Sequence, residues 1–251
     1  MVKGLKIESM TWFDIKKYLD DGYKTLVVAV GSIEQHGPHL PLITDTIIGE
    51  NLVTEITKKL GKALQGPTIR LGCSNHHMCF PGTISLNPET LKAIIFDYVS
   101  CMNQHGFQNI IFIPSHGGNF KVLEEAITTL QNKYPSTKII GFTDLYKYID
   151  VTMQFSYDEG IKKEDAGAHA GETETSLMLY LYDEFVKKER FVPGYIGNFG
   201  KKEGELVLKS NISVLSNKGI LGDPTKASAS KGQKYLEKTA NFMVEEIKKM
   251  I

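Results

Sequence analysis

Three side chains that commonly bind metal ions lie close together near the N-terminus: Glu34, His36 and Asp45. Glu34 and His36 are two residues apart, so in extended backbone their side chains point the same way. Two prolines between His36 and Asp45 stiffen the loop that would bring the second carboxylate back. A mixed set of carboxylates and imidazole suits Zn, Mn or Fe(II) better than Ca or Mg. Taken alone, the stretch also fits a polar loop with an Asp that caps a helix.

A second polar turn follows another apolar run. The first set of polar residues comes directly after residues 25–30, which are typical of a buried strand. The apolar run at residues 109–114 leads in the same way into a turn with His116, Gly117 and Gly118. Open α/β sheets bind ligands at the carboxyl ends of their strands, so we expect the two turns to contribute to one site. The glycines would let the backbone approach a metal closely.

A third polar segment, residues 168–176, opens a helical pattern and carries His169, Glu172 and Glu174. The two glutamates are two residues apart, so on a helix they project about 200° from each other and cannot both face one metal. In a first helical turn either is also favoured by the helix dipole without binding anything. His169, a lone histidine before a helix, is compatible with a loop role and with catalysis.

The rest of the chain shows no internal repeat, low-complexity segment or linker, which predicts one domain over residues 1–251. Two more strands are predicted, at residues 67–71 and 138–143, and residues after 190 are predicted as short strands or loops, including 206–208. Helices are predicted at residues 12–20, 46–60, 88–105, 119–133, 144–157 and 229–250. Asp45 would then precede a helix by one residue, as an N-cap does.

Composition narrows the range of partners and compartments. The chain has 29 basic and 29 acidic residues and a formal charge of zero. Nucleic acids are bound through an excess of Lys and Arg, so neither a nucleic acid nor an anionic membrane is expected as a partner. The three cysteines have no CxxC spacing, and the chain has neither an apolar leader nor a long apolar run. These features predict a cytoplasmic protein.

Three motifs resemble those of the creatininase family of metal-dependent amidohydrolases. Residues 31–45 resemble its signature Gly-Ser-x-Glu-Gln-His-Gly-Pro-His-Leu-Pro-x-x-Thr-Asp, residues 80–86 are a Phe-Pro-Gly-Thr-Ile-Ser-Leu segment, and residues 169–176 match His-Ala-Gly-x-x-Glu-Thr-Ser. The resemblance implies a three-layer α/β/α sandwich with a mostly parallel central sheet. It also implies two divalent metal ions per chain, Zn, Mn or Fe(II), and a homo-oligomer, often a hexamer.

The same resemblance implies roles for particular residues. Glu34, Asp45 and His116 would hold one metal, and His36, Asp45 and Glu174 the other, with the Asp45 carboxylate bridging. His169 resembles the catalytic histidine that passes a proton to the leaving nitrogen. The residues implied in substrate binding are His77, Gly117 and Gly118.

The reaction implied is attack by a metal-bridged hydroxide on the carbonyl of a small cyclic amide or formamide. Creatininases carry a His-Tyr-Glu-Asn turn whose Glu binds the second metal, but this chain has Gly118 at that position. Either Glu174 fills the gap or the second metal is weak or missing. Since Trp12 is the only tryptophan, the pocket tryptophans that cover creatinine are absent. The alternatives are a C–C or lactone hydrolase acting on a cyclic polyol or sugar derivative, and a non-catalytic scaffold with one structural metal.

Overall fold

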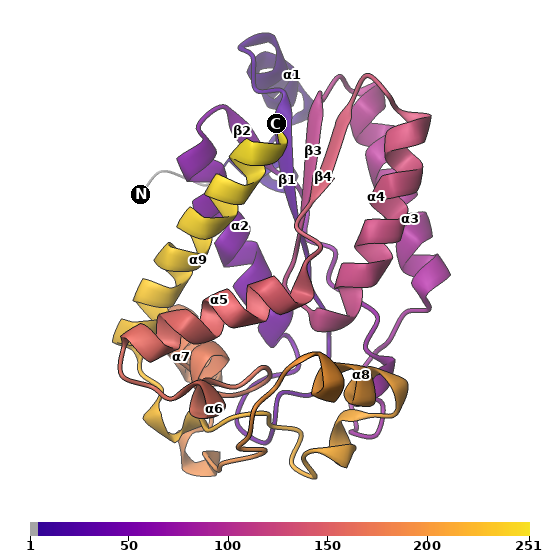
Figure 1. Cartoon of the computed structure of the whole chain (residues 1–251). Helices are drawn as coiled ribbons and strands as arrows, with labels where there is room; N and C mark the ends of the chain where they lie inside the picture. The colour runs from indigo at the N-terminus through magenta and orange to yellow at the C-terminus, as the bar shows by residue number, and fades with distance from the viewer. Residues whose placement is uncertain (1–4) are drawn as a thin grey trace.

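A parallel sheet of four strands lies at the centre of the molecule (Figure 1). The computed structural model describes residues 5–251. The strands are β1 (Thr25–Val30), β2 (Ala63–Gln65), β3 (Asn109–Pro114) and β4 (Lys138–Gly141). Their order is β2-β1-β3-β4, and each neighbouring pair is parallel. The chain passes from β1 to one side and returns to the other side for β3, and such a switch point is where α/β sheets bind ligands.

Helices cover one face of the sheet through side chains that alternate along the strands. Val27 and Ala29 of β1 and Ile111 and Ile113 of β3 point into this layer and are fully buried. The helices of this layer are α2 (Thr44–Leu60), α7 (Glu172–Leu181) and α9 (Ala229–Met250), with α5 (Leu145–Asp158) packed beside α9. This layer holds the larger part of the apolar core.

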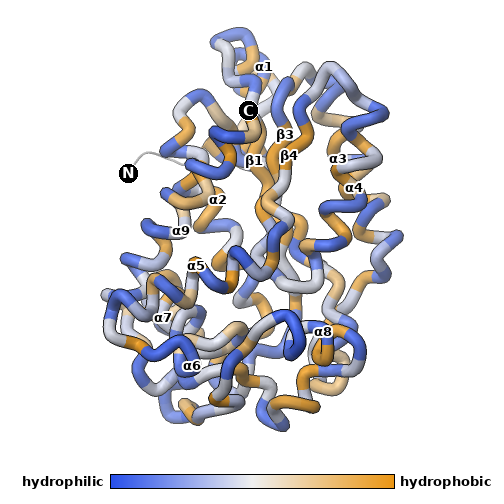
Figure 2. The backbone as a smooth tube through the Cα atoms, viewed as in Figure 1, coloured by the Kyte–Doolittle hydropathy of each residue, from blue (hydrophilic) through white to orange (hydrophobic). Residues whose placement is uncertain are grey.

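The opposite face is covered by a second group of helices. The intervening strand residues, such as Leu26, Val28 and Phe112, pack here against Leu91 and Leu123. The helices are α1 (Trp12–Asp20), α3 (Pro88–Gln104) and α4 (Phe120–Lys133). Figure 2 shows apolar residues along β1, and alternating apolar and polar stretches along the outer helices. The predicted three-layer α/β/α arrangement with a parallel central sheet is therefore confirmed.

Two shorter helices and the loops around them lie beyond the carboxyl end of the sheet. They are α6 (Lys163–Ala166) and α8 (Lys201–Lys209), in the lower part of Figure 1. None of the helices within residues 5–251 combines the length and the apolar character that a membrane span needs.

Several local predictions are confirmed and three are wrong. The strands at residues 25–30 and 109–114 are as predicted, and α3 begins at Pro88 with Asn87 as its N-cap. The strand predicted at residues 67–71 is wrong, because β2 ends at Gln65 and only an isolated bridge joins Ile69 to Val30. Residues 206–208, predicted as strand or loop, belong to α8. Asp45 is not an N-cap: α2 begins at Thr44, so Asp45 lies in its first turn.

Candidate functional site

The five residues predicted as metal ligands meet at the carboxyl edge of the sheet. Glu34 and His36 lie in the loop after β1, His116 directly after β3, and Asp45 and Glu174 in the first turns of α2 and α7. Ligand atoms of Glu34, Asp45 and His116 all lie within 4.8 Å of one another, and so do those of His36, Asp45 and Glu174. These two sets share only Asp45, and ligand atoms of Glu34, His36 and His169 form a third such group.

The Asp45 carboxylate stands between two histidines. His36 Nε2 lies 3.2 Å from Asp45 Oδ1, whereas His116 Nδ1 lies 3.2 Å from Asp45 Oδ2. Each histidine also faces a glutamate: His36 Nε2 is 3.8 Å from Glu174 Oε2, and His116 Nδ1 is 3.1 Å from Glu34 Oε2. One carboxylate therefore presents one oxygen to each set.

The donor set fits divalent cations. Glu34 is fully buried, yet neither of its carboxylate oxygens accepts a hydrogen bond from the part of the chain that the structure describes. Ring nitrogens of His77 and His116 approach these oxygens to 3.3 and 3.1 Å, without hydrogen-bond alignment. A buried carboxylate without partners is strongly disfavoured, and a cation between these groups would supply the missing partner.

The carboxylates set up a strongly negative environment. Burial lowers the pKa of His36, but the charges of Asp45 and Glu174 outweigh burial and raise this pKa to about 10. Burial raises the pKa of Glu174 to about 7, although His36 opposes the shift. Burial also acts to raise the pKa of Asp45, but His36 and His116 hold it well below its usual range. Carboxylates that raise the pKa of His36 in this way also attract metal ions, which compete with protons for the same atoms.

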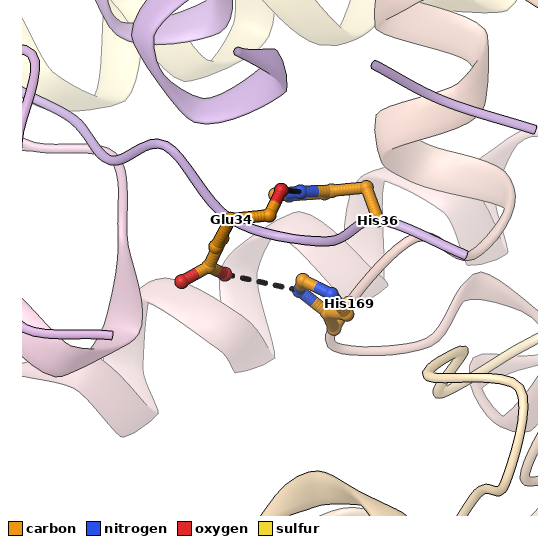
Figure 3. Close-up of side chains that lie close together, drawn as sticks. All are labelled: Glu34, His36 and His169. Atoms are coloured by element: carbon orange, nitrogen blue, oxygen red, sulfur yellow. Dashed lines mark hydrogen bonds and ion pairs between the residues drawn. The ribbon is translucent and has the colours of Figure 1, made fainter. Parts of the chain in front are cut away.

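His169 lies beside the first ligand set. Its Nδ1 is 3.7 Å from Glu34 Oε1 (Figure 3), and its Nε2 lies 2.8 Å from the carbonyl oxygen of Gln35. With the proton on Nε2 donated to that carbonyl, Nδ1 faces the site with its lone pair. Ala170 adopts a left-handed conformation (φ 52°), and its N–H donates to Glu174 Oε2 at 2.6 Å. This turn lets His169 and Glu174 line the same cavity.

Two residues that the sequence analysis did not single out orient the others. The side-chain amide of Gln35 donates to Gly219 O at 3.1 Å and lies 2.9 Å from His77 Nδ1, so it fixes the His77 ring with Nε2 toward Glu34. Ser32 donates from Oγ to Asp45 Oδ2 at 2.7 Å. Their position in the sequence could have indicated this role, because both residues lie within the same polar stretch as the predicted ligands.

A cavity of about 100 Å³ lies against most of the predicted site residues. Its lining includes Glu34, Asp45, His77, His116, Gly117, His169 and Glu174. Gly118 lies outside it, on an outer groove, and a Cβ there would come within 2.1 Å of the Cys73 carbonyl oxygen. Gly118 therefore permits close packing of the turn behind His116. Of the residues predicted for the site, all except Gly118 and His36 line the cavity.

The whole chain resembles proteins of one family. The family profile described as creatinine amidohydrolase matches residues 8–247. A mycofactocin precursor peptide peptidase of Mycolicibacterium smegmatis is 30% identical over 229 residues, covering 89% of this chain and 84% of that protein. The creatinine amidohydrolase of Pseudomonas putida is 26% identical over 249 residues, with 94% of each chain covered.

A solved structure agrees with these matches. A crystal structure of creatinine amidohydrolase superimposes with a TM-score of 0.81 at 25% identity, covering 98% of this chain and 97% of the other. The predicted resemblance is thus confirmed over nearly the full length, and the chain belongs to the creatininase family of hydrolases.

Proposed function

We propose that the chain hydrolyses a C–N bond in a small cyclic amide or formamide, using two divalent metal ions, Zn, Mn or Fe(II). Glu34, Asp45 and His116 would hold one ion, and His36, Asp45 and Glu174 would hold the other. The observation that carries the proposal is the pair of ligand sets that share one carboxylate beside the imidazole of His169. Family membership supports the hydrolytic chemistry.

Each group has a separate task. Metal ions held by these residues would supply an activated water and would polarise the substrate carbonyl. Glu34 and Asp45 supply negative charge, and the Ser32 hydroxyl fixes the Asp45 carboxylate. His77 and Gly117 line the cavity where the substrate would lie. The buried surroundings exclude bulk water and strengthen these electrostatic interactions.

His169 is suited to move the proton. Its Nε2 is tied to the Gln35 carbonyl oxygen at 2.8 Å, so the free Nδ1 faces the cavity. From there the ring can accept a proton and deliver it to the leaving nitrogen. Gln35 also orients His77, so one side chain and its backbone hold both histidines in place.

Glu174 would fill the gap in the second ligand set, because Gly118 stands where creatininases carry a glutamate in the turn after the third strand. Gly118 has no side-chain donor, whereas Glu174 Oε2 lies 3.8 Å from His36 Nε2 on the open side of the second set. Glu174 therefore completes that set from a different helix.

Metal removal tests the proposal. We expect a chelator to abolish hydrolysis and Mn, Zn or Fe(II) to restore it, with two metal equivalents per chain by elemental analysis. The substrate panel would contain creatinine, formamides, lactones and keto-inositols, so that a C–C or lactone hydrolase is distinguished from an amidase. Fewer than about one and a half equivalents without hydrolysis of any compound would indicate a structural-metal scaffold.

Substitution of His169 separates proton transfer from metal binding. We expect His169→Gln to lower kcat by about 10²- to 10⁴-fold, because no titratable group would remain to protonate the leaving nitrogen. Metal content should stay at the level of the unsubstituted chain. His105→Gln, at the exposed C-terminal end of α3, is the matched control and should change neither quantity. Loss of metal from His169→Gln would assign this histidine to the ligands.

We also infer a cytoplasmic homo-oligomer, with a hexamer as the expected size, that acts on a small molecule. Family membership supports the assembly, and the exposed Trp12 and Phe13 on α1 fit a subunit contact. Light scattering would measure the number of subunits.

A further inference from the structure

The wall of the cavity that faces the ligand sets is apolar. Six aliphatic or aromatic side chains from α5, α8 and the adjoining loops form it: Leu145, Ile149, Phe199, Val207, Leu208 and Ile212. Within the described part of the chain, neither a lysine nor an arginine lines this cavity. The only charged side chains in its lining, histidines aside, are three carboxylates: Glu34, Asp45 and Glu174.

The spacing of residues along α8 produces this wall. Gly204, Val207 and Leu208 stand at positions i, i+3 and i+4, so they share the helix face that lines the cavity. A Cβ at Gly204 would lie 2.8 Å from the Tyr146 hydroxyl oxygen, so glycine allows α8 to pack closely against α5. Leu206 lies between these positions and does not line the cavity.

The wall discriminates between substituents by charge. A charged group against this wall would be buried among aliphatic and aromatic side chains, and within the described residues the cavity lining has no lysine or arginine to pair with it, which is disfavoured. An apolar group would instead exchange water for aliphatic contacts, a gain of about fourfold in affinity per buried CH₂. The volume of about 100 Å³ accommodates a group of a few carbon atoms.

We infer that α8 selects a substrate whose group beside the scissile carbonyl is small, apolar and uncharged. The inference rests on the proposed function, because it places the carbonyl at the two ligand sets. It assigns Leu208 as a specificity-determining residue. Substrates that carry a phosphate or carboxylate next to the reacting carbonyl are disfavoured by the same wall.

Hydroxamates test this selection without turnover, because they bind divalent metals through two oxygens and carry a variable group beside the carbonyl. The probes are acetohydroxamic acid, isovalerohydroxamic acid and the monohydroxamate of malonic acid, whose carboxymethyl group has nearly the shape of isobutyl. Calorimetric titration of the Mn-loaded protein measures each Kd. We expect isobutyl to bind at least about 10-fold more tightly than methyl, and carboxymethyl at least about 100-fold more weakly than isobutyl.

A matched pair of variants on one helix assigns the effect to Leu208. Leu208→Lys should tighten binding of the malonic monohydroxamate by at least about 10-fold and weaken isovalerohydroxamate, because it adds a cation to the cavity. Leu206→Lys is the control: the residue type and helix are the same, the exposed fractions are similar at 44% and 48%, and Leu206 lies outside the cavity. It should leave all three affinities unchanged.

The outcomes separate the two proposals. Equal affinity for isobutyl and carboxymethyl, or equal effects of the two lysine variants, would overturn the selection by α8 while leaving the metal centre intact. If the purified protein takes up no Mn, the metal centre is overturned and the inference with it, whereas failure of all three hydroxamates to bind to a Mn-loaded protein would overturn only the inference.

Discussion

Asp45→Asn is expected to release metal from both positions and to lower kcat/KM by at least about 10⁴-fold. The two carboxylate oxygens of Asp45 face different histidines, with Oδ1 at 3.2 Å from His36 Nε2 and Oδ2 at 3.2 Å from His116 Nδ1. Asparagine has one oxygen and no charge, so it cannot serve two cations at once. Elemental analysis of the purified variant gives the metal content, and steady-state kinetics gives kcat/KM.

A second buried aspartate provides the control. Asp165 is 8% exposed and pairs with Lys226 at 2.6 Å, outside the cavity over the ligand sets. Asp165→Asn should keep full metal content and activity. Only the free energy of unfolding should fall. Circular dichroism of Asp45→Asn should show the native fold, since Asp45 lies in a helix held by the apolar side chains of α2. Two metal equivalents in folded Asp45→Asn would refute the shared carboxylate.

Local sequence patterns were sufficient to predict the elements that place the site. Residues 25–30 and 109–114 are apolar runs buried between two helical layers, and such runs are recognisable without knowledge of their neighbours. The ligand types follow these strands directly, so their convergence at one sheet edge could be expected from parallel pairing. The angle between two positions on a helix indicated only that Glu172 and Glu174 cannot both face one metal, and the resemblance to the family motif selected Glu174.

Other features depend on tertiary contacts and could not be predicted in this way. β2 has only three residues, Ala63–Gln65, too few for a pattern, and it is defined by pairing with β1. The three consecutive apolar residues 206–208 show no helical periodicity, yet they belong to α8, and only the cavity shows which face of this helix is the inner one. The orientation of His77 depends on Gln35, and such a hydrogen bond between distant segments leaves no trace in spacing.

Glu174→Gln and Glu172→Gln are expected to affect different properties, although the two residues are only two positions apart on α7: the first should affect metal binding and activity, and the second stability. Glu174 faces the cavity, so its substitution should remove the cation on the His36 side and lower kcat/KM by about 10³-fold. The free energy of unfolding of the metal-free Glu174→Gln protein should change little, because glutamine keeps an oxygen that can accept from the Ala170 N–H. Metal equivalents per chain should fall from two to one.

Glu172 points away from the site and into the contact with α9. It is fully buried and accepts hydrogen bonds from Ser176 Oγ at 2.8 Å and from the Tyr235 hydroxyl at 3.2 Å, with Lys231 Nζ 3.7 Å away. Because glutamine loses the charge that faces Lys231 Nζ and one of the two acceptor oxygens beside the Tyr235 hydroxyl, Glu172→Gln should lower the free energy of unfolding by about 1–3 kcal/mol while two metal equivalents remain bound. Chemical denaturation and elemental analysis together measure both effects. If Glu172→Gln loses metal and Glu174→Gln keeps it, the second ligand set is built from the other glutamate.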